Sequence, residues 1–201
     1  AAPVTLADGR HIEVEANVGN PAEARDALAH GADGVGLLRT EFLFLDRDTP
    51  PTEDEQVAVL SEIATALEGR QVVVRTLDAG ADKPVRFIAQ EPELNPYLGR
   101  RGLRLSLAEP EIFSTQLRAI VRAAEGHNLA VMFPMVSTVE EVTAARAAID
   151  RATAASRTAG AKVSREVKLG VMVEFGGVTP AIAKAPGAAN TGEHIAHRVA
   201  V

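Results

Sequence analysis

Arg39, Arg75 and Glu174 each come directly after a run of apolar residues in the sequence. Such runs are typical of β-strands buried on both faces, and in a parallel β/α fold the carboxyl ends of the strands form the ligand-binding face. A guanidinium beside a buried sheet needs an anion, and its planar fork fits a phosphate or a carboxylate with two hydrogen bonds. Arg39 and Arg75 therefore predict an oxyanion clamp at the ends of two strands.

A purely structural interpretation of these charges competes with the clamp. Arg39 could pair with Glu41, and Arg75 with Asp78, because each carboxylate follows its arginine within three residues. Glu174 alone says little about a metal, since Mg²⁺ is usually held by one or two carboxylates together with water and substrate phosphate. Its spacing alone favours a hydrogen-bonded glutamate over a metal ligand.

Positive charge is concentrated in residues 95–104, which contain three arginines, among them Arg101. Small anions can bind where a few arginines converge, but a solvated basic loop is the alternative interpretation of this segment. Lys83 lies in a short polar stretch, where a mobile loop lysine is an equally good interpretation.

The elements that would position these residues alternate between strands and helices. This alternation implies a parallel sheet, and near-continuous apolar strands imply burial on both faces. The pattern alone leaves a doubly wound sheet and a barrel open, although no Gly-x-Gly-x-x-Gly turn supports a dinucleotide-binding fold. The expected strands are 11–17, 34–38, 71–74, 129–133 and 168–173.

Four helices are expected between these strands. Asn20 suits a helix N-cap and Gly31 a left-handed helix end, while Thr52 and Thr138 each open a capping box with a glutamate three residues later. The remaining helix spans about 110–125, with apolar residues at helical spacing.

The composition bounds the fold and the partners. A chain of 201 residues supports one good core, yet it is shorter than the roughly 250 residues of a closed (β/α)8 barrel. A net charge of −6 argues against nucleic acid as the main partner, and no run approaches the ~18 apolar residues of a membrane span. With no secretory signal in sight, a cytoplasmic location is expected. The absence of cysteine excludes thiol chemistry on this chain.

Five segments of the sequence closely resemble phosphoenolpyruvate-protein phosphotransferase, Enzyme I of the bacterial sugar phosphotransferase system. They occur in the order of that family between about Ile12 and Glu174: GLLRTEFLFLDRD at 36–48, VRTLD at 74–78, NPYLGRR at 95–101, MFPM at 132–135 and GVMVE at 170–174. The resemblance implies a (β/α)8 barrel that binds phosphoenolpyruvate and Mg²⁺ and forms a homodimer.

The resemblance also implies roles for individual residues. In that family the phosphoryl group of phosphoenolpyruvate passes to a histidine on a separate N-terminal domain, and then to a small histidine phosphocarrier. Glu174 matches the position of a Mg²⁺ ligand. The implied phosphoenolpyruvate ligands are Arg39, Arg75 and Arg101, with Lys83 and Asn95 on weaker matches.

The resemblance ends abruptly at Glu174. The family's second metal ligand (an aspartate), a further arginine and a catalytic cysteine have no match in 175–201, which is rich in Gly, Ala and Pro. We therefore expect a partial barrel of about five parallel strands over 1–174 and a weakly ordered tail over 175–201. We hypothesise a truncated or frameshifted gene, and expect that the chain alone does not turn over phosphoenolpyruvate. Resequencing across the codons for 174–181 tests the genetic part of this hypothesis.

Two other functions remain open at this point. The chain could be a non-catalytic remnant or dimerisation module that binds partners without chemistry. Pyruvate phosphate dikinase and phosphoenolpyruvate synthase share the barrel and are the lesser enzymatic alternative, but the sequence RTEFLF at 39–44 fits Enzyme I better.

Overall fold

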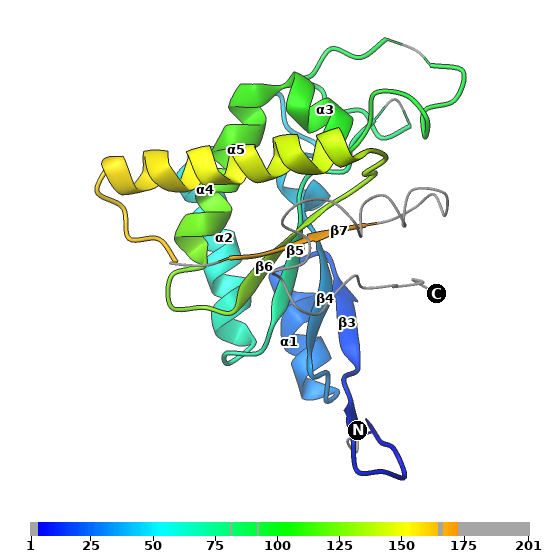
Figure 1. Ribbon diagram of the computed structural model, residues 1–201, viewed down its shortest axis with the longest axis vertical. Coiled ribbons are helices and arrows are strands. Elements are labelled where there is room, and N and C mark those ends of the chain that lie inside the picture. Colours follow the sequence, from blue (N-terminus) through cyan, green and yellow to red (C-terminus); the bar gives the residue numbers. More distant parts are fainter. Residues whose placement is uncertain (1–3, 81, 92, 165–166, 173–201) are drawn as a thin grey trace.

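Five parallel strands form the main sheet of the computed structural model, which describes residues 4–80, 82–91, 93–164 and 167–172 (Figure 1). The strands pair in sequential order, each with the next along the chain. A doubly wound sheet reverses its order at a switch point, whereas this order is that of a partial (β/α) barrel. The strands are β3 (Glu15–Val18), β4 (Gly34–Arg39), β5 (Val72–Arg75), β6 (Leu129–Phe133) and β7 (Lys168–Val171).

The helices that connect the strands form one layer beside the sheet (Figure 1). α1 packs on α2, α2 on α4, and α4 on α5. The core lies between this layer and the sheet, where Leu38, Val74 and Ile120 are all fully buried. The long connecting helices are α1 (Pro21–Ala29), α2 (Glu53–Ala66), α4 (Pro110–Ala123) and α5 (Val139–Thr158).

The predicted helix starts are confirmed by their capping hydrogen bonds. The side chain of Asn20 accepts a hydrogen bond from the Glu23 N–H at 2.9 Å. Thr52 and Thr138 each form the reciprocal capping box. Gly31 follows α1 with a φ of +87°, the left-handed conformation that glycine adopts without strain. These local signals fix the helix boundaries because their partners are only three residues away.

The single strand predicted over 11–17 is wrong in its pairing. β2 (His11–Ile12) pairs antiparallel with β1 (Val4–Thr5) in a separate hairpin, and β3 joins the parallel sheet. Between them the Val14 N–H donates to the Asp33 carboxylate at 2.8 Å, outside either strand ladder. Alternating polarity predicts extended backbone, but it does not say with which neighbour each residue pairs.

Two short helices were not predicted. The 3-10 helix η1 (Thr40–Leu43) continues directly from β4, and α3 (Leu103–Ala108) follows the loop after β5. α3 begins after Gly102 without a side-chain cap, so its six residues carry no local start signal. Leu103 and Leu105 are buried, and packing rather than propensity therefore stabilises this turn and a half.

None of the helices in the described ranges combines the length and the apolar character needed to cross a membrane.

Candidate anion-binding site

Arg39 and Arg75 end two adjacent strands and are paired in register across β4 and β5. Leu38 and Val74, which directly precede the two arginines, are buried against the helices. Leu37 and Val73, one residue earlier on each strand, are half-buried. Because side chains alternate across a strand, both arginines lie on the sheet face opposite the helix layer. The prediction that they share one end of adjacent strands is confirmed.

Arg75 is almost buried and holds two carboxylates. Its Nη2 lies 2.8 Å from Glu41 Oε1, its Nη1 lies 3.2 Å from Asp78 Oδ2, and Nη1 also lies 3.9 Å from the sulfur of Met172. The third guanidinium nitrogen, Nε, is buried, and its N–H has no hydrogen-bond acceptor among the described residues. The structural interpretation of Arg75 as an ion-pair partner of Asp78 is therefore confirmed, but it leaves the Nε–H unpaired.

Asp78 also binds Arg101 and so connects two buried guanidinium groups. Arg101 Nε donates to Asp78 Oδ1 at 3.0 Å, and its Nη1 donates to Asp82 Oδ2 at 2.7 Å. The guanidinium lies over the ring of Tyr97, 4.6 Å from its centroid. Burial lowers the pKa of Arg101, but the two aspartates outweigh that effect and raise the pKa above its ordinary value, so the side chain stays charged. A solvated basic loop is thus the wrong interpretation for Arg101, which is only 5% exposed.

Arg39 differs from both of these arginines. It is exposed, and it forms no ion pair with any residue that the structure describes. The expected alternative of an Arg39–Glu41 pair is wrong, because the chain turns into η1 after Arg39 and the Glu41 carboxylate binds Arg75 instead.

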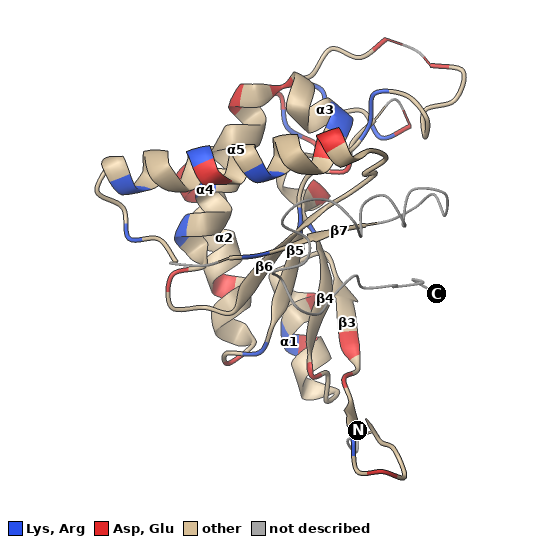
Figure 2. Ribbon diagram, viewed as in Figure 1, with Lys and Arg blue, Asp and Glu red and all other residues tan. Residues whose placement is uncertain are grey.

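These contacts determine what the strand ends can do chemically. Three carboxylates neutralise Arg75 and Arg101, whereas the Arg39 guanidinium and the Nε–H of Arg75 are left without acceptors in the described part of the chain. Basic and acidic segments accordingly occur together above the upper ends of the strands (Figure 2). Among the described residues, Arg39 is therefore the arginine at these strand ends whose charge is not compensated by a carboxylate.

The other predicted site residues are less tightly connected to this cluster. The Lys83 side chain is exposed, and its backbone N–H donates to the Gly80 carbonyl at 2.9 Å. Asn95 is exposed, and its carbonyl accepts from the Leu98 N–H. Glu174 lies outside the described residues.

The described residues contain no group of three or more His, Cys, Asp or Glu side chains that could hold a metal ion. The carboxylates nearest Arg75 and Arg101 are committed to those guanidinium groups.

Sequence reasoning missed the buried polar side chain that contacts the strand ends from behind. Gln116 lies on the inward face of α4, in the same stripe as Phe113, Leu117 and Ile120, and is 2% exposed. A glutamine within an otherwise apolar stripe was the available signal, because a buried amide must find hydrogen-bond partners.

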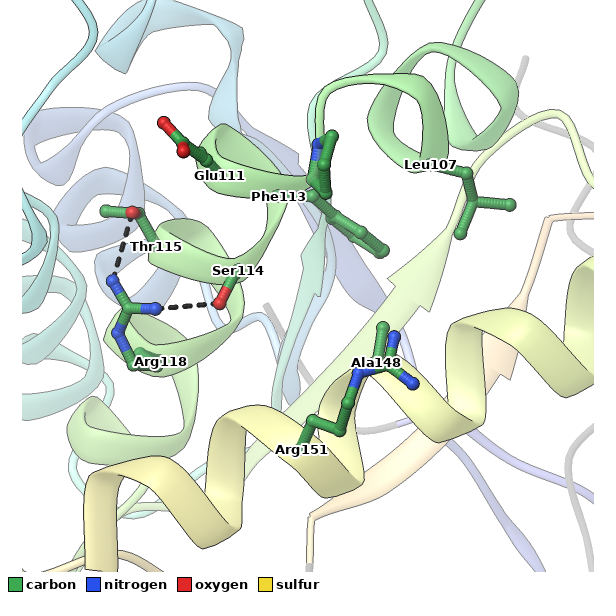
Figure 3. Close-up of a pocket in the computed structure, with 9 residues that line it drawn as sticks. Leu107, Glu111, Phe113, Ser114, Thr115, Arg118, Ala148 and Arg151 are labelled. Atoms are coloured by element: carbon green, nitrogen blue, oxygen red, sulfur yellow. Dashed lines mark hydrogen bonds between the residues drawn. The ribbon is translucent and has the colours of Figure 1, made fainter. Parts of the chain in front are cut away.

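A pocket of about 590 Å³ lies elsewhere, between α3, α4 and α5 (Figure 3). It is lined by residues that include Phe113, Arg118 and Arg151, and Arg118 donates to the hydroxyls of Ser114 and Thr115. It contains none of the residues that the sequence predicted for binding. The arginines of the strand ends and this pocket are therefore separate features.

Comparison with known proteins places the chain among enzymes that use phosphoenolpyruvate. Residues 1–189 match the family described as PEP-utilising enzyme, PEP-binding domain. The relatives include proteins named phosphoenolpyruvate-protein phosphotransferase from Haloferax volcanii (50% identical over 184 residues, 90% of this chain), Staphylococcus carnosus (45% over 169 residues, 84%) and Bacillus subtilis (45% over 173 residues, 86%). The chain spans only 30 to 32% of the length of these curated relatives.

Proposed function

The chain belongs to the phosphoenolpyruvate-utilising enzymes, as part of their phosphoenolpyruvate-binding domain, and from this membership we propose that Arg39 and Arg75 bind the substrate's anionic groups. The proposed ligand site lies at the carboxyl ends of β4 and β5, on the sheet face opposite the helices. Arg101 stabilises it through Asp78, and Lys83 and Asn95 are proposed as further contacts from the loop after β5.

One observation carries this proposal. Arg75 keeps a buried Nε–H without an acceptor in the described part of the chain, next to the strand whose last residue is the unpaired Arg39. A buried donor left unsatisfied costs roughly 1–3 kcal/mol, so a phosphate or carboxylate oxygen that displaced the atoms now covering Nε would remove this penalty and add a charge-assisted bond.

We propose the activity of the relatives for the whole protein to which this domain belongs. Its reaction, in the cytoplasm, would move the phosphoryl group of phosphoenolpyruvate to a protein histidine and then to a histidine phosphocarrier. This transfer would supply the phosphoryl group for sugar uptake. Two guanidinium groups suit this reaction because phosphoryl transfer depends on positioning and on neutralising the charge of the phosphoryl oxygens.

Mg²⁺ and a homodimer belong to the same proposal. Mg²⁺ rests on the family likeness and on Glu174, whose place in the sequence matches that of a Mg²⁺ ligand in the family. Self-association is supported by β3 and β7, each of which pairs with only one other strand of the described sheet. Open sheet edges favour pairing with another chain.

A rival proposal is a non-catalytic module. It is favoured by the carboxylates of Glu41, Asp78 and Asp82, which already neutralise Arg75 and Arg101 and could make them purely structural.

Isothermal titration with phosphoenolpyruvate, with and without Mg²⁺, decides between the two. We expect the chain to bind, and Arg39→Ala to weaken binding at least tenfold, since a charge-assisted contact contributes about 1.5–3 kcal/mol. Arg151→Ala is the matched control, because Arg151 is an exposed arginine on α5 with no ion pair among the described residues. Absence of binding, or equal losses in both variants, would favour the non-catalytic module.

Turnover is a separate question with a separate assay. The chain has no cysteine, and the residues after Glu174 match neither the family's second metal ligand nor its cysteine, so we expect no pyruvate from the chain alone. The chain is mixed with phosphoenolpyruvate, Mg²⁺ and phosphocarrier, and pyruvate and phosphohistidine are measured. Pyruvate release above the buffer rate would contradict this expectation.

A further inference from the structure

Gln116 connects the helix layer to the ends of β4 and β5 through an unbroken chain of hydrogen bonds. Its Oε1 accepts from the Leu77 N–H at 3.0 Å, and its Nε2 donates to the Thr40 hydroxyl oxygen at 3.1 Å. The Thr40 hydroxyl in turn donates to the carbonyl of Arg75 at 2.8 Å. Both polar atoms of the Gln116 amide are therefore hydrogen-bonded. The oxygen must accept because its partner is an N–H, and the nitrogen must donate because the Thr40 hydroxyl already donates to Arg75.

The partners of Gln116 lie next to the two arginines of the proposed anion site. Thr40 follows Arg39 directly, and Leu77 lies two residues after Arg75. Gln116 and Thr40 are 2% and 1% exposed, so both lie behind the sheet end and away from any ligand in front of it. A buried hydrogen-bond network in which every member is satisfied holds its groups in one arrangement.

The backbone after β5 depends on this support. The Thr76 N–H bonds to the Met132 carbonyl of β6, which continues the strand ladder. Beyond that residue the ladder ends, and the next two N–H groups are bonded by side chains: Leu77 by Gln116, and Asp78 by Glu41. The segment that carries Arg75 and Asp78 is thus held by side chains from two other elements.

We propose that Gln116 and Thr40 are positioning residues for the anion site: they set the spacing and orientation of the two strand ends and thereby of Arg39 and Arg75. This inference rests on the proposed function for its effect on phosphoenolpyruvate. The structural half, that Gln116 fixes the end of β5, stands independently of any ligand. Neither residue touches the anion, so their effect is transmitted through the backbone of Arg75 and Leu77.

The matched variants are Gln116→Met and Gln56→Met. Methionine approximates the shape of glutamine but lacks its amide. Gln56 is the control because it is equally buried, at 1% exposure, and its amide donates to the Pro51 carbonyl before α2 rather than to the residues that follow β4 and β5. Gln116→Met should disturb the anion site, and Gln56→Met should leave it intact.

Amide hydrogen exchange of Leu77 is the ligand-independent measurement. We expect Gln116→Met to accelerate exchange of the Leu77 N–H at least tenfold relative to Gln56→Met, when both are compared at equal global stability. Unchanged exchange of Leu77 would overturn the proposal, whether or not the chain binds phosphoenolpyruvate.

Affinity for phosphoenolpyruvate is the second measurement. We expect about tenfold weaker binding in Gln116→Met and Thr40→Val, and retained affinity in Thr40→Ser, which keeps the hydroxyl, and in Gln56→Met. Faster Leu77 exchange with unaltered affinity would overturn the positioning role. A wild-type chain that binds no phosphoenolpyruvate would refute the proposed function, while the exchange result would still decide whether Gln116 holds the strand end.

Discussion

Two networks of charged residues in this protein have nearly the same composition and different surroundings. The strand-end network contains Arg75 and Arg101 with Glu41, Asp78 and Asp82. The helix-layer network contains Arg118 and Arg122 of α4 with Glu53 and Asp54 of α2. In each, one carboxylate joins two arginines: Asp78 in the first and Glu53 in the second.

Burial separates the two networks. The side chains of Arg101 and Asp78 are 6% and 5% exposed, whereas Arg118 and Glu53 are 29% and 24% exposed. Breaking a buried pair leaves an uncompensated charge, while exposed pairs contribute little because water and salt replace them. Chemically similar ion pairs therefore have different weight, and within the described part of the chain only the buried network lies beside an unpaired arginine at the end of the sheet.

Removing the central carboxylate of the strand-end network should have the largest effect. Asp78→Ala leaves Arg75 and Arg101 buried with fewer partners, and we expect the free energy of unfolding to fall by about 3–5 kcal/mol. Urea unfolding of Asp78→Ala and the parent measures this difference in the free energy of unfolding. A loss as small as that of Glu53→Gln would remove the distinction between the networks.

Arg39→Lys tests whether the free arginine beside the strand-end network binds an anion with two hydrogen bonds. Lysine keeps the charge but loses the planar fork, so phosphoenolpyruvate should bind about tenfold more weakly with little change in stability. Arg151→Lys on α5 provides the control, because it makes the same exchange at an exposed arginine of the helix layer. Equal affinity of the Arg39→Lys variant and the parent would count against a bidentate clamp.

Glu53→Gln breaks the centre of the helix-layer network. Because its side chain is about a quarter exposed, we expect the free energy of unfolding to fall by only about 1 kcal/mol. The loss should shrink further in high salt, which screens accessible charges. A salt-independent loss of several kcal/mol would mean that this network behaves as a buried one.

Acid should remove the contribution of Glu53 gradually. Burial raises the pKa of Glu53, but hydrogen bonds from Arg122 and Arg118 outweigh this effect and hold the pKa below its ordinary value of 4.5. Since the folded pKa is the lower one, the stabilisation is fully present above pH 4.5 and is lost as the pH falls through the folded value. Unfolding curves of the parent and Glu53→Gln should therefore converge below that pH. A gap that does not shrink at any pH at which the protein stays folded would show that the carboxylate charge does not stabilise the folded state.

The sequence by itself determined the order of strands and helices, most helix starts and the meeting of Arg39 with Arg75. Capping partners lie three residues apart, and buried strands appear as apolar runs, so a few neighbouring residues are enough to predict these features. Consecutive β/α units place their strands side by side, which brings the two arginines together without further information.

Only the tertiary structure decided the partners that charged and polar groups find far away in the sequence. Glu41 pairs with Arg75 instead of its near neighbour Arg39, and Gln116 reaches Thr40 across 76 positions of sequence. Local patterns carry no record of such partners, because they depend on how α4 packs behind the sheet and on where β4 turns into η1. The same dependence explains the failure at 11–17, where alternation predicted an extended chain but tertiary pairing divided it between a hairpin and the parallel sheet.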